Sequence, residues 1–151
     1  MPSLNHSHDS VFLVGTPDQL VPSYKTPLFL CRIAAGFPSP ADDFIESKID
    51  LNEQLILHPE ATYFLRVKGD SMIGAGIHEG DLLIVDRSLD PKSGRIVIAA
   101  FNGELTVKRL HISKSRQITL IPENETYDPI KVNEDSDFLI WGVVTRVIHD
   151  V

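Results

Sequence analysis

Closely spaced short strands are the feature that most constrains the fold of this chain. Apolar, aromatic and β-branched runs follow residue 61 and are separated by turn residues; they are Thr62–Val67, Leu82–Val85, Arg95–Phe101, Glu104–Leu110, Gln117–Ile121 and Phe138–Ile148. Asn102-Gly103 joins two of these runs and predicts a type I′ hairpin, because both central residues of that turn need a positive φ. The pattern predicts a mainly β domain of mostly antiparallel strands with short helices.

Proline sets the N-terminal part of the chain apart. Six of the ten prolines lie in the first 40 residues, where they discourage helices and central strands. We therefore expect residues 1–38 to form an extended arm that docks against another surface, and a disordered tail fits the same composition. Ser39-Pro40-Ala41-Asp42 is typical of a helix start. Asp50 and Glu53 resemble a capping box for a second short helix that ends at Pro59.

Charge and cysteine content exclude several classes of protein. The net charge of −7 argues against a basic nucleic-acid-binding domain, so we expect little direct nucleic-acid binding. Cys31 is the only cysteine, which excludes an intramolecular disulfide and a cysteine-rich zinc site. No apolar run reaches the ~18–20 residues needed to cross a bilayer, and the N-terminus lacks a secretory signal pattern. We expect a cytoplasmic protein that does not contact a membrane.

Most familiar catalytic and metal motifs are absent from the sequence. There is no G-x-S-x-G, no glycine-rich phosphate loop and no H-E-x-x-H. His6 and His8 are close enough to chelate a metal ion, but such a pair in a tail is seldom a site, and His58, His78, His111 and His149 are isolated in sequence. We expect neither a metal nor a cofactor.

A serine and a lysine are the candidates for chemistry. Ser71 follows the Thr62–Val67 strand, where Gly69 allows a sharp turn, and we expect its side chain to be exposed beside backbone N–H groups that can stabilise an oxyanion. Lys108 lies on the Glu104–Leu110 strand and can act as a base if burial favours its neutral form. An ordinary turn and a solvent-facing lysine would give the same pattern, so neither residue indicates a site by itself.

Eight short motifs, taken together and in order, are more specific. They are Ala35-Gly36-Phe37-Pro38-Ser39-Pro40-Ala41, Ile49-Asp50-Leu51-Asn52, His58-Pro59-Glu60-Ala61-Thr62-Tyr63-Phe64, Gly69-Asp70-Ser71-Met72, Gly80-Asp81-Leu82-Leu83-Ile84-Val85-Asp86, Ile96-Val97-Ile98-Ala99-Ala100, Leu105-Thr106-Val107-Lys108 and Trp141-Gly142-Val143-Val144. This series resembles the LexA/UmuD family of serine–lysine self-cleaving proteins, of peptidase S24 type. The resemblance covers residues 36–151 and extends weakly into the arm.

The resemblance implies a fold and a set of site residues. The expected fold is a LexA-like β-clip catalytic domain over residues 36–151, which dimerises and is preceded by a cleavable arm, residues 1–35. Ser71 would be the nucleophile and Lys108 the general base. The backbone N–H groups of Asp70 and Ser71 would hold the oxyanion, and the bond cut would be Ala35-Gly36.

The resemblance also implies partners and a cellular role. RecA filaments on single-stranded DNA would stimulate the cut, and the trimmed homodimer would join a UmuC-type polymerase in error-prone translesion synthesis during the SOS response. Binding of the arm to the polymerase processivity clamp stays open, because residues 1–34 match the family poorly.

Two alternatives to this function stay open, and a third is disfavoured. One is a non-catalytic clip domain that only binds a polymerase. Another is a truncated LexA-type repressor, although the first 35 residues are neutral and show no amphipathic helix pair. A signal peptidase uses the same two residues but needs a membrane anchor, and no such segment is found.

Overall fold

A computed structural model describes residues 10–17, 25–29 and 45–151 of the chain. These residues fall into two compact units. The larger unit contains residues 10–17 and 58–151, and the smaller one contains the described residues between 18 and 57. Each unit has a β-sheet of its own.

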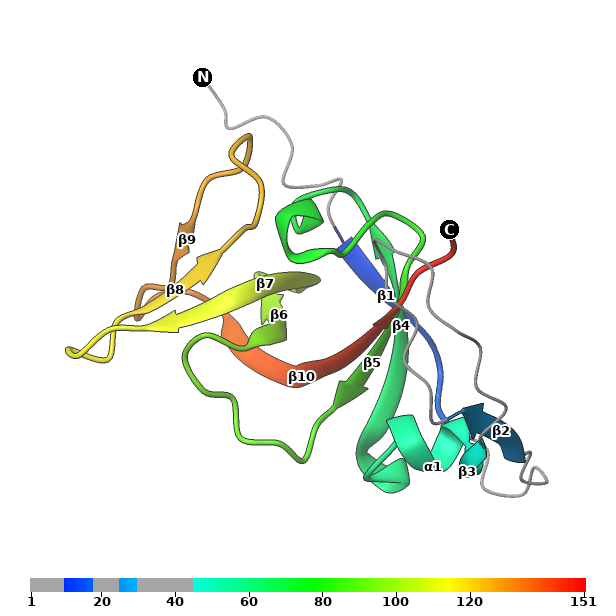
Figure 1. Cartoon of the computed structure of the whole chain (residues 1–151). Coiled ribbons are helices and arrows are strands. Elements are labelled where there is room, and N and C mark those ends of the chain that lie inside the picture. The colour runs from blue at the N-terminus through cyan, green and yellow to red at the C-terminus, as the bar shows by residue number, and fades with distance from the viewer. Residues whose placement is uncertain (1–9, 18–24, 30–44) are drawn as a thin grey trace. The chain divides into compact units, whose positions relative to one another are not determined.

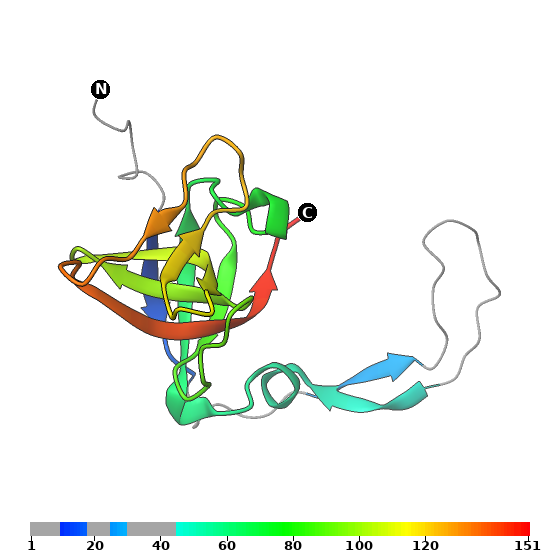
Figure 2. The same ribbon diagram turned by 90° about the vertical axis from the view of Figure 1, so that its left-hand side faces the viewer.

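The larger unit is built on one eight-stranded sheet. Its strands are β1 (Ser10–Gly15), β4 (Thr62–Lys68), β5 (Leu82–Asp86), β6 (Ile96–Phe101), β7 (Glu104–Ile112), β8 (Ile118–Ile121), β9 (Ile130–Lys131) and β10 (Phe138–Ile148). They lie in the order β1-β4-β5-β10-β6-β7-β8-β9, and every pair is antiparallel. The sheet is strongly curled, and the long strand β10 bends around it between β5 and β6 (Figures 1 and 2).

The sequence prediction of a mainly antiparallel β fold is confirmed. All six predicted strands are present, with ends that differ by at most two residues. The β6–β7 hairpin turns at Asn102 and Gly103, whose φ angles are 50° and 82°. Strand β9 was not predicted, because two residues carry no periodic signal.

The predicted arm contributes a strand to the main sheet. Strand β1 pairs with β4, with Val11 opposite Val67, and the Val11 side chain is buried. The neighbouring Phe12, Leu13 and Val14 are each about half exposed. Within the described part of the arm, this strand docks against the protein's own sheet.

The smaller unit holds a two-stranded sheet and a short helix. Strands β2 (Lys25–Phe29) and β3 (Ile45–Asp50) pair antiparallel, with Pro27 opposite Lys48. Proline is tolerated in β2 because a two-stranded sheet leaves one side of each strand without a ladder partner. The sequence had not predicted either strand, and the predicted helix start at residues 39–42 lies outside the described residues.

The predicted second helix exists but is shorter than expected. Helix α1 (Leu51–Leu55) is capped by Asp50, whose carboxylate accepts a hydrogen bond from the backbone N–H of Asn52 at 2.8 Å. Pro59 does not end this helix; it begins a separate 3-10 turn, Pro59–Ala61. Of the helices in the described ranges, none is long and apolar enough to span a bilayer.

Two buried apolar clusters stabilise the larger unit. One contains Val11, Leu65, Val67, Met72, Ile77, Leu83, Val85, Ile98 and Val107, and the other contains Val97, Ala99, Leu110, Leu120 and Val143. Strand β6 contributes to both, because Ile98 faces one cluster while its neighbours face the other. This arrangement explains why β6 is a continuous apolar run rather than an alternating one.

Candidate active site

Ser71 lies in the loop that joins β4 to β5. Gly69 directly follows β4 and has a φ of 95°, which permits the sharp turn that the sequence predicted. The two ends of the loop are joined by backbone hydrogen bonds, from Gly80 N–H to Val67 O at 2.9 Å and from Val67 N–H to Asp81 O at 3.0 Å. The loop is therefore held at its base, and Ser71 occupies a fixed position within it.

The expectation that Ser71 is exposed is wrong. Its exposed fraction is 0%. The loop folds inward instead of projecting from the strand end, because the flanking side chains of Met72 and Ile77 belong to the apolar core. The hydroxyl is therefore shielded from bulk water.

Lys108 is buried next to this serine. It lies on β7, opposite Val97 of β6, in the register that the Asn102-Gly103 turn fixes. Its exposed fraction is 3%, and its Nζ lies 2.9 Å from Ser71 Oγ. The structure thus brings together the two side chains that the sequence proposed as nucleophile and base.

Two further acceptors surround the lysine nitrogen. Nζ donates hydrogen bonds to Thr106 Oγ1 at 2.9 Å and to the Val107 carbonyl at 3.1 Å. A carbonyl can only accept, so one amine hydrogen is directed to Val107. If a second hydrogen is directed to Thr106, the lone pair of a neutral amine faces Ser71, which is the orientation that proton abstraction requires.

The loop that carries Ser71 is braced by the segment after β8. The backbone N–H of Glu123 donates to Ser71 O at 2.8 Å, and Gly74 N–H donates to Glu123 O, also at 2.8 Å. Asn124 Nδ2 donates to Asp70 O at 3.0 Å, and the Tyr127 hydroxyl donates to Asp70 Oδ1 at 2.5 Å. Sequence reasoning missed these residues, because nothing in residues 121–127 signals a contact with a loop some fifty residues earlier.

Glu123 is itself anchored to the strand that carries the lysine. Its carboxylate accepts a hydrogen bond from Arg109 Nε, and Arg109 follows Lys108 on β7. Arg109 Nη1 also donates to Gly94 O at 2.7 Å. One ion pair therefore connects the lysine strand to the segment that braces the serine loop.

The structure does not test the roles predicted for the other site residues, which are Ala35, Gly36 and the backbone of Asp70 and Ser71. Ala35 and Gly36 lie outside the described residues. Asp70 is exposed and bonded to Tyr127, so its side chain positions the loop. The assignment of the Asp70 and Ser71 backbone N–H groups as an oxyanion hole stays a prediction.

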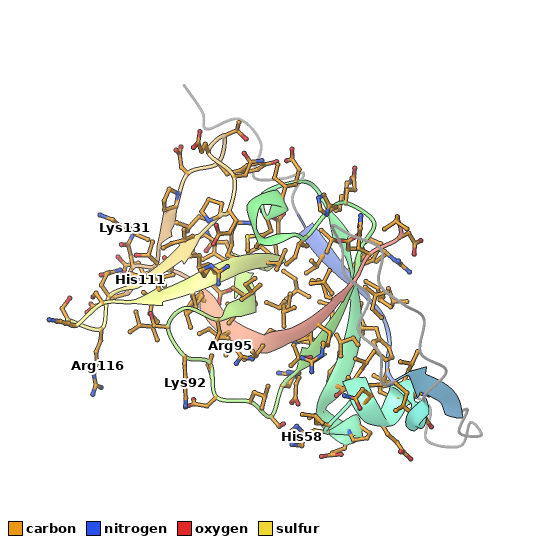
Figure 3. All side chains as sticks on the ribbon, in the orientation of Figure 1. His58, Lys92, Arg95, His111, Arg116 and Lys131 are labelled. Carbon is orange, nitrogen blue, oxygen red and sulfur yellow. The ribbon has the colours of Figure 1, made fainter. Side chains whose placement is uncertain are left out.

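A histidine–aspartate pair fixes the start of β4. His58 Nδ1 lies 2.5 Å from Asp86 Oδ2, and Thr62 Oγ1 donates to His58 O at 2.6 Å. The hydrogen bond with Asp86 raises the pKa of His58 above 6.5, although desolvation acts in the opposite direction. Burial acts to raise the pKa of Asp86, but hydrogen bonds from Ser88 and His58 outweigh it and hold this pKa below 3.8. Figure 3 shows His58 at the periphery, near the 3-10 turn that precedes β4.

Comparison with known proteins identifies relatives along most of the chain. Residues 27–145 match the Peptidase S24-like family. Protein SamA of Salmonella typhimurium strain LT2 is 45% identical over 139 residues, which cover 92% of this chain and 96% of SamA. Protein ImpA of Escherichia coli is 48% identical over 130 residues, covering 84% of this chain and 86% of ImpA.

A repressor is among the relatives as well. The LexA repressor of Xylella fastidiosa is 46% identical over 120 residues, which cover 80% of this chain but only 56% of the repressor. The matched family segment includes both Ser71 and Lys108. The match covers most of the length of SamA and ImpA and about half of the repressor. The chain belongs to the Peptidase S24-like family, together with its UmuD-like and LexA-like relatives.

Proposed function

We propose that this protein is a serine peptidase that cuts its own N-terminal arm, with Ser71 as nucleophile and Lys108 as general base. The observation that carries the proposal is the 2.9 Å separation of Lys108 Nζ and Ser71 Oγ, with both side chains buried. Apolar side chains would fill this position without the desolvation cost of an amine and a hydroxyl, so packing alone does not explain the buried pair. Membership of a peptidase family supports the same reading.

The chemical steps follow from the groups around Lys108. The neutral amine accepts the Ser71 proton as Oγ attacks the carbonyl carbon of Ala35, and the Asp70 and Ser71 backbone N–H groups stabilise the resulting oxyanion. The ammonium then returns the proton to the Gly36 nitrogen as the peptide bond breaks. Water hydrolyses the Ala35 ester on Ser71, with Lys108 again as base, and frees the arm.

Intramolecularity makes a modest catalyst sufficient. A tethered substrate has a high effective concentration, so a dyad without a histidine can act at a useful rate. Gly36 lacks a side chain, which lets the backbone of the cleavage site approach the buried serine closely. Each molecule cuts once, so rapid product release is not required.

The cellular role we assign is SOS mutagenesis. It rests on the resemblance to the LexA/UmuD family and on the similarity to SamA and ImpA over most of the chain. RecA filaments on single-stranded DNA would stimulate the cut. The trimmed protein, as a homodimer, would then act with a UmuC-type polymerase in translesion synthesis.

The experiment uses the full chain with RecA, single-stranded DNA and a nucleotide analogue. We expect the native protein to be trimmed, and the Ser71→Ala, Lys108→Ala and Lys108→Arg variants to remain intact, since arginine stays protonated and cannot act as base. Ser115→Ala and Lys114→Ala are matched controls at exposed positions and should be trimmed normally. Trimming of the Ser71→Ala variant would exclude the proposed nucleophile and favour a non-catalytic domain cut by another peptidase.

A further inference from the structure

Three side chains that are distant in sequence meet at one end of the main sheet. His78 and Asp81 lie in the β4–β5 loop, and His149 follows the last residue of β10. Their potential ligand atoms all lie within 4.8 Å of one another. Sequence reasoning treated both histidines as isolated, because their separation along the chain gives no sign of this contact.

The carboxylate lies at the centre of the cluster. Asp81 Oδ1 is 2.6 Å from His149 Nδ1, and Asp81 Oδ2 is 3.8 Å from His78 Nδ1. The backbone N–H of His78 donates to Asp81 Oδ2 at 2.7 Å, which fixes the orientation of the carboxylate. The two imidazole rings lie beside each other, with centroids 4.7 Å apart.

Burial differs sharply among the three groups. The Asp81 side chain is only 2% exposed, whereas those of His78 and His149 are 48% and 44% exposed. The Asp81 carboxylate is thus buried just below the protein surface, beneath two imidazole rings that water can reach. The buried carboxylate is already held in place by its hydrogen bond, and the two exposed imidazoles leave the cluster accessible to an ion from solution.

We propose that His78, Asp81 and His149 form a binding site for a divalent transition-metal ion of the zinc class. Two imidazole nitrogens and one carboxylate oxygen are a donor set that Zn²⁺ accepts, with a fourth position left for water. The set favours zinc, cobalt or nickel over magnesium and calcium, which prefer oxygen ligands.

The position of the cluster gives the ion a structural consequence. Asp81 O accepts the hydrogen bond that holds the base of the Ser71 loop, and His149 directly follows β10. A bound ion therefore ties the end of β10 to the stem of the loop that carries Ser71. Because the ion binds the folded arrangement, it raises the melting temperature.

The first test is a calorimetric zinc titration of the full chain carrying His6→Ala and His8→Ala, which removes the other histidine pair. We expect one zinc ion per chain. Adding His78→Ala or His149→Ala should raise the dissociation constant by at least about tenfold, because loss of a ligand's hydrogen-bond partner alone costs about that much and these residues are the ligands themselves. Adding His111→Ala is the matched control, because His111 is exposed on β7 and lies outside the cluster (Figure 3). The proposal is overturned if the parent does not bind zinc or if the His78 and His149 variants bind as tightly as the parent.

A second measurement avoids dependence on the variants. Cobalt(II) added to the same parent should give visible absorption bands of a four- or five-coordinate site, and stoichiometric zinc should abolish them. A cobalt spectrum identical to that of the hydrated ion contradicts the proposal. Both measurements are independent of self-cleavage, so the metal site stands or fails separately from the proposed peptidase function.

Discussion

The Glu123 backbone makes two hydrogen bonds to the loop that carries Ser71. Its N–H donates to Ser71 O and its carbonyl accepts from Gly74 N–H, each at 2.8 Å. Position 74 has no room for a side chain in this arrangement. A Cβ built on Gly74 would lie 2.7 Å from Glu123 O, which is a backbone atom and cannot rotate away. The loop that carries Ser71 and the segment after β8 are therefore in contact at a position that only glycine fits.

Gly74→Ala should separate these two segments. We expect a loss of about 1–3 kcal/mol in the free energy of unfolding, typical of overpacking, and slower trimming because Ser71 shifts relative to Lys108. Urea unfolding and the trimming rate measure the two effects. Gly15→Ala is the matched control, since its added Cβ meets nothing within 4 Å. Equal stability and equal trimming in the two variants would show that the contact does not position the loop.

Thr106 should position the lysine amine. Replacing it by valine removes the Oγ1 acceptor that lies 2.9 Å from Lys108 Nζ while keeping the side-chain shape. We expect trimming to slow by about tenfold, the equivalent of one hydrogen bond, and its pH profile to move. Thr106→Ser should restore both, and Thr119→Val on β8 should change neither. A rate loss without any change in pH profile would indicate a structural role instead.

Spontaneous trimming should carry the signature of a lysine base. Only the neutral amine can accept the Ser71 proton, so the rate without RecA should rise with pH, by about tenfold per unit while the ammonium form dominates. First-order rates from about pH 7 to 10, with circular dichroism at each point to confirm folding, test this. A rate that follows a histidine-like midpoint near 6.5 would exclude lysine as the base.

Six strands of the main sheet were predictable because their signals are local. Asn102-Gly103 set the β6–β7 hairpin, and that turn also fixed Lys108 opposite Val97. Strands β1, β2 and β3 were missed because proline and weak periodicity hide them, and each forms only by pairing with a partner strand. The prediction that Ser71 is exposed was wrong for a related reason. Its loop folds inward because Met72 and Ile77 enter the core.

The pairing of Ser71 with Lys108 was predicted from the resemblance and not from pattern alone. The groups that hold it in place could not be predicted. Glu123, Asn124 and Tyr127 reach the serine loop through tertiary contacts between loops, and loops of this kind have no periodicity to read. The same limit explains why His78 and His149 were taken as isolated.

The His58–Asp86 pair should make stability depend on pH. The pKa of His58 is raised above 6.5, so its contribution is complete below that pH and is lost as the pH rises through the raised value. The pKa of Asp86 is lowered below 3.8, so on the acid side the contribution is lost only as the pH falls through that lowered value. His58→Gln should therefore lower the free energy of unfolding most at about pH 5 and least at about pH 8.5.

Urea unfolding of the native protein and of His58→Gln at both pH values measures this difference. His111→Gln is the control, because His111 is exposed on β7, well away from His58 (Figure 3). An effect of His58→Gln that is the same at both pH values would mean that the ion pair does not contribute.

The identity of the cut bond tests the central claim most directly. Protein activated by RecA filaments is analysed by intact mass and N-terminal sequencing. We predict one stable fragment that begins at Gly36 and contains 116 of the 151 residues, since residues 1–35 are lost. Gly36→Glu should block its formation, because a bulky side chain cannot approach the buried Ser71. A fragment with a different first residue, or the same fragment from Ser71→Ala protein, would contradict the account.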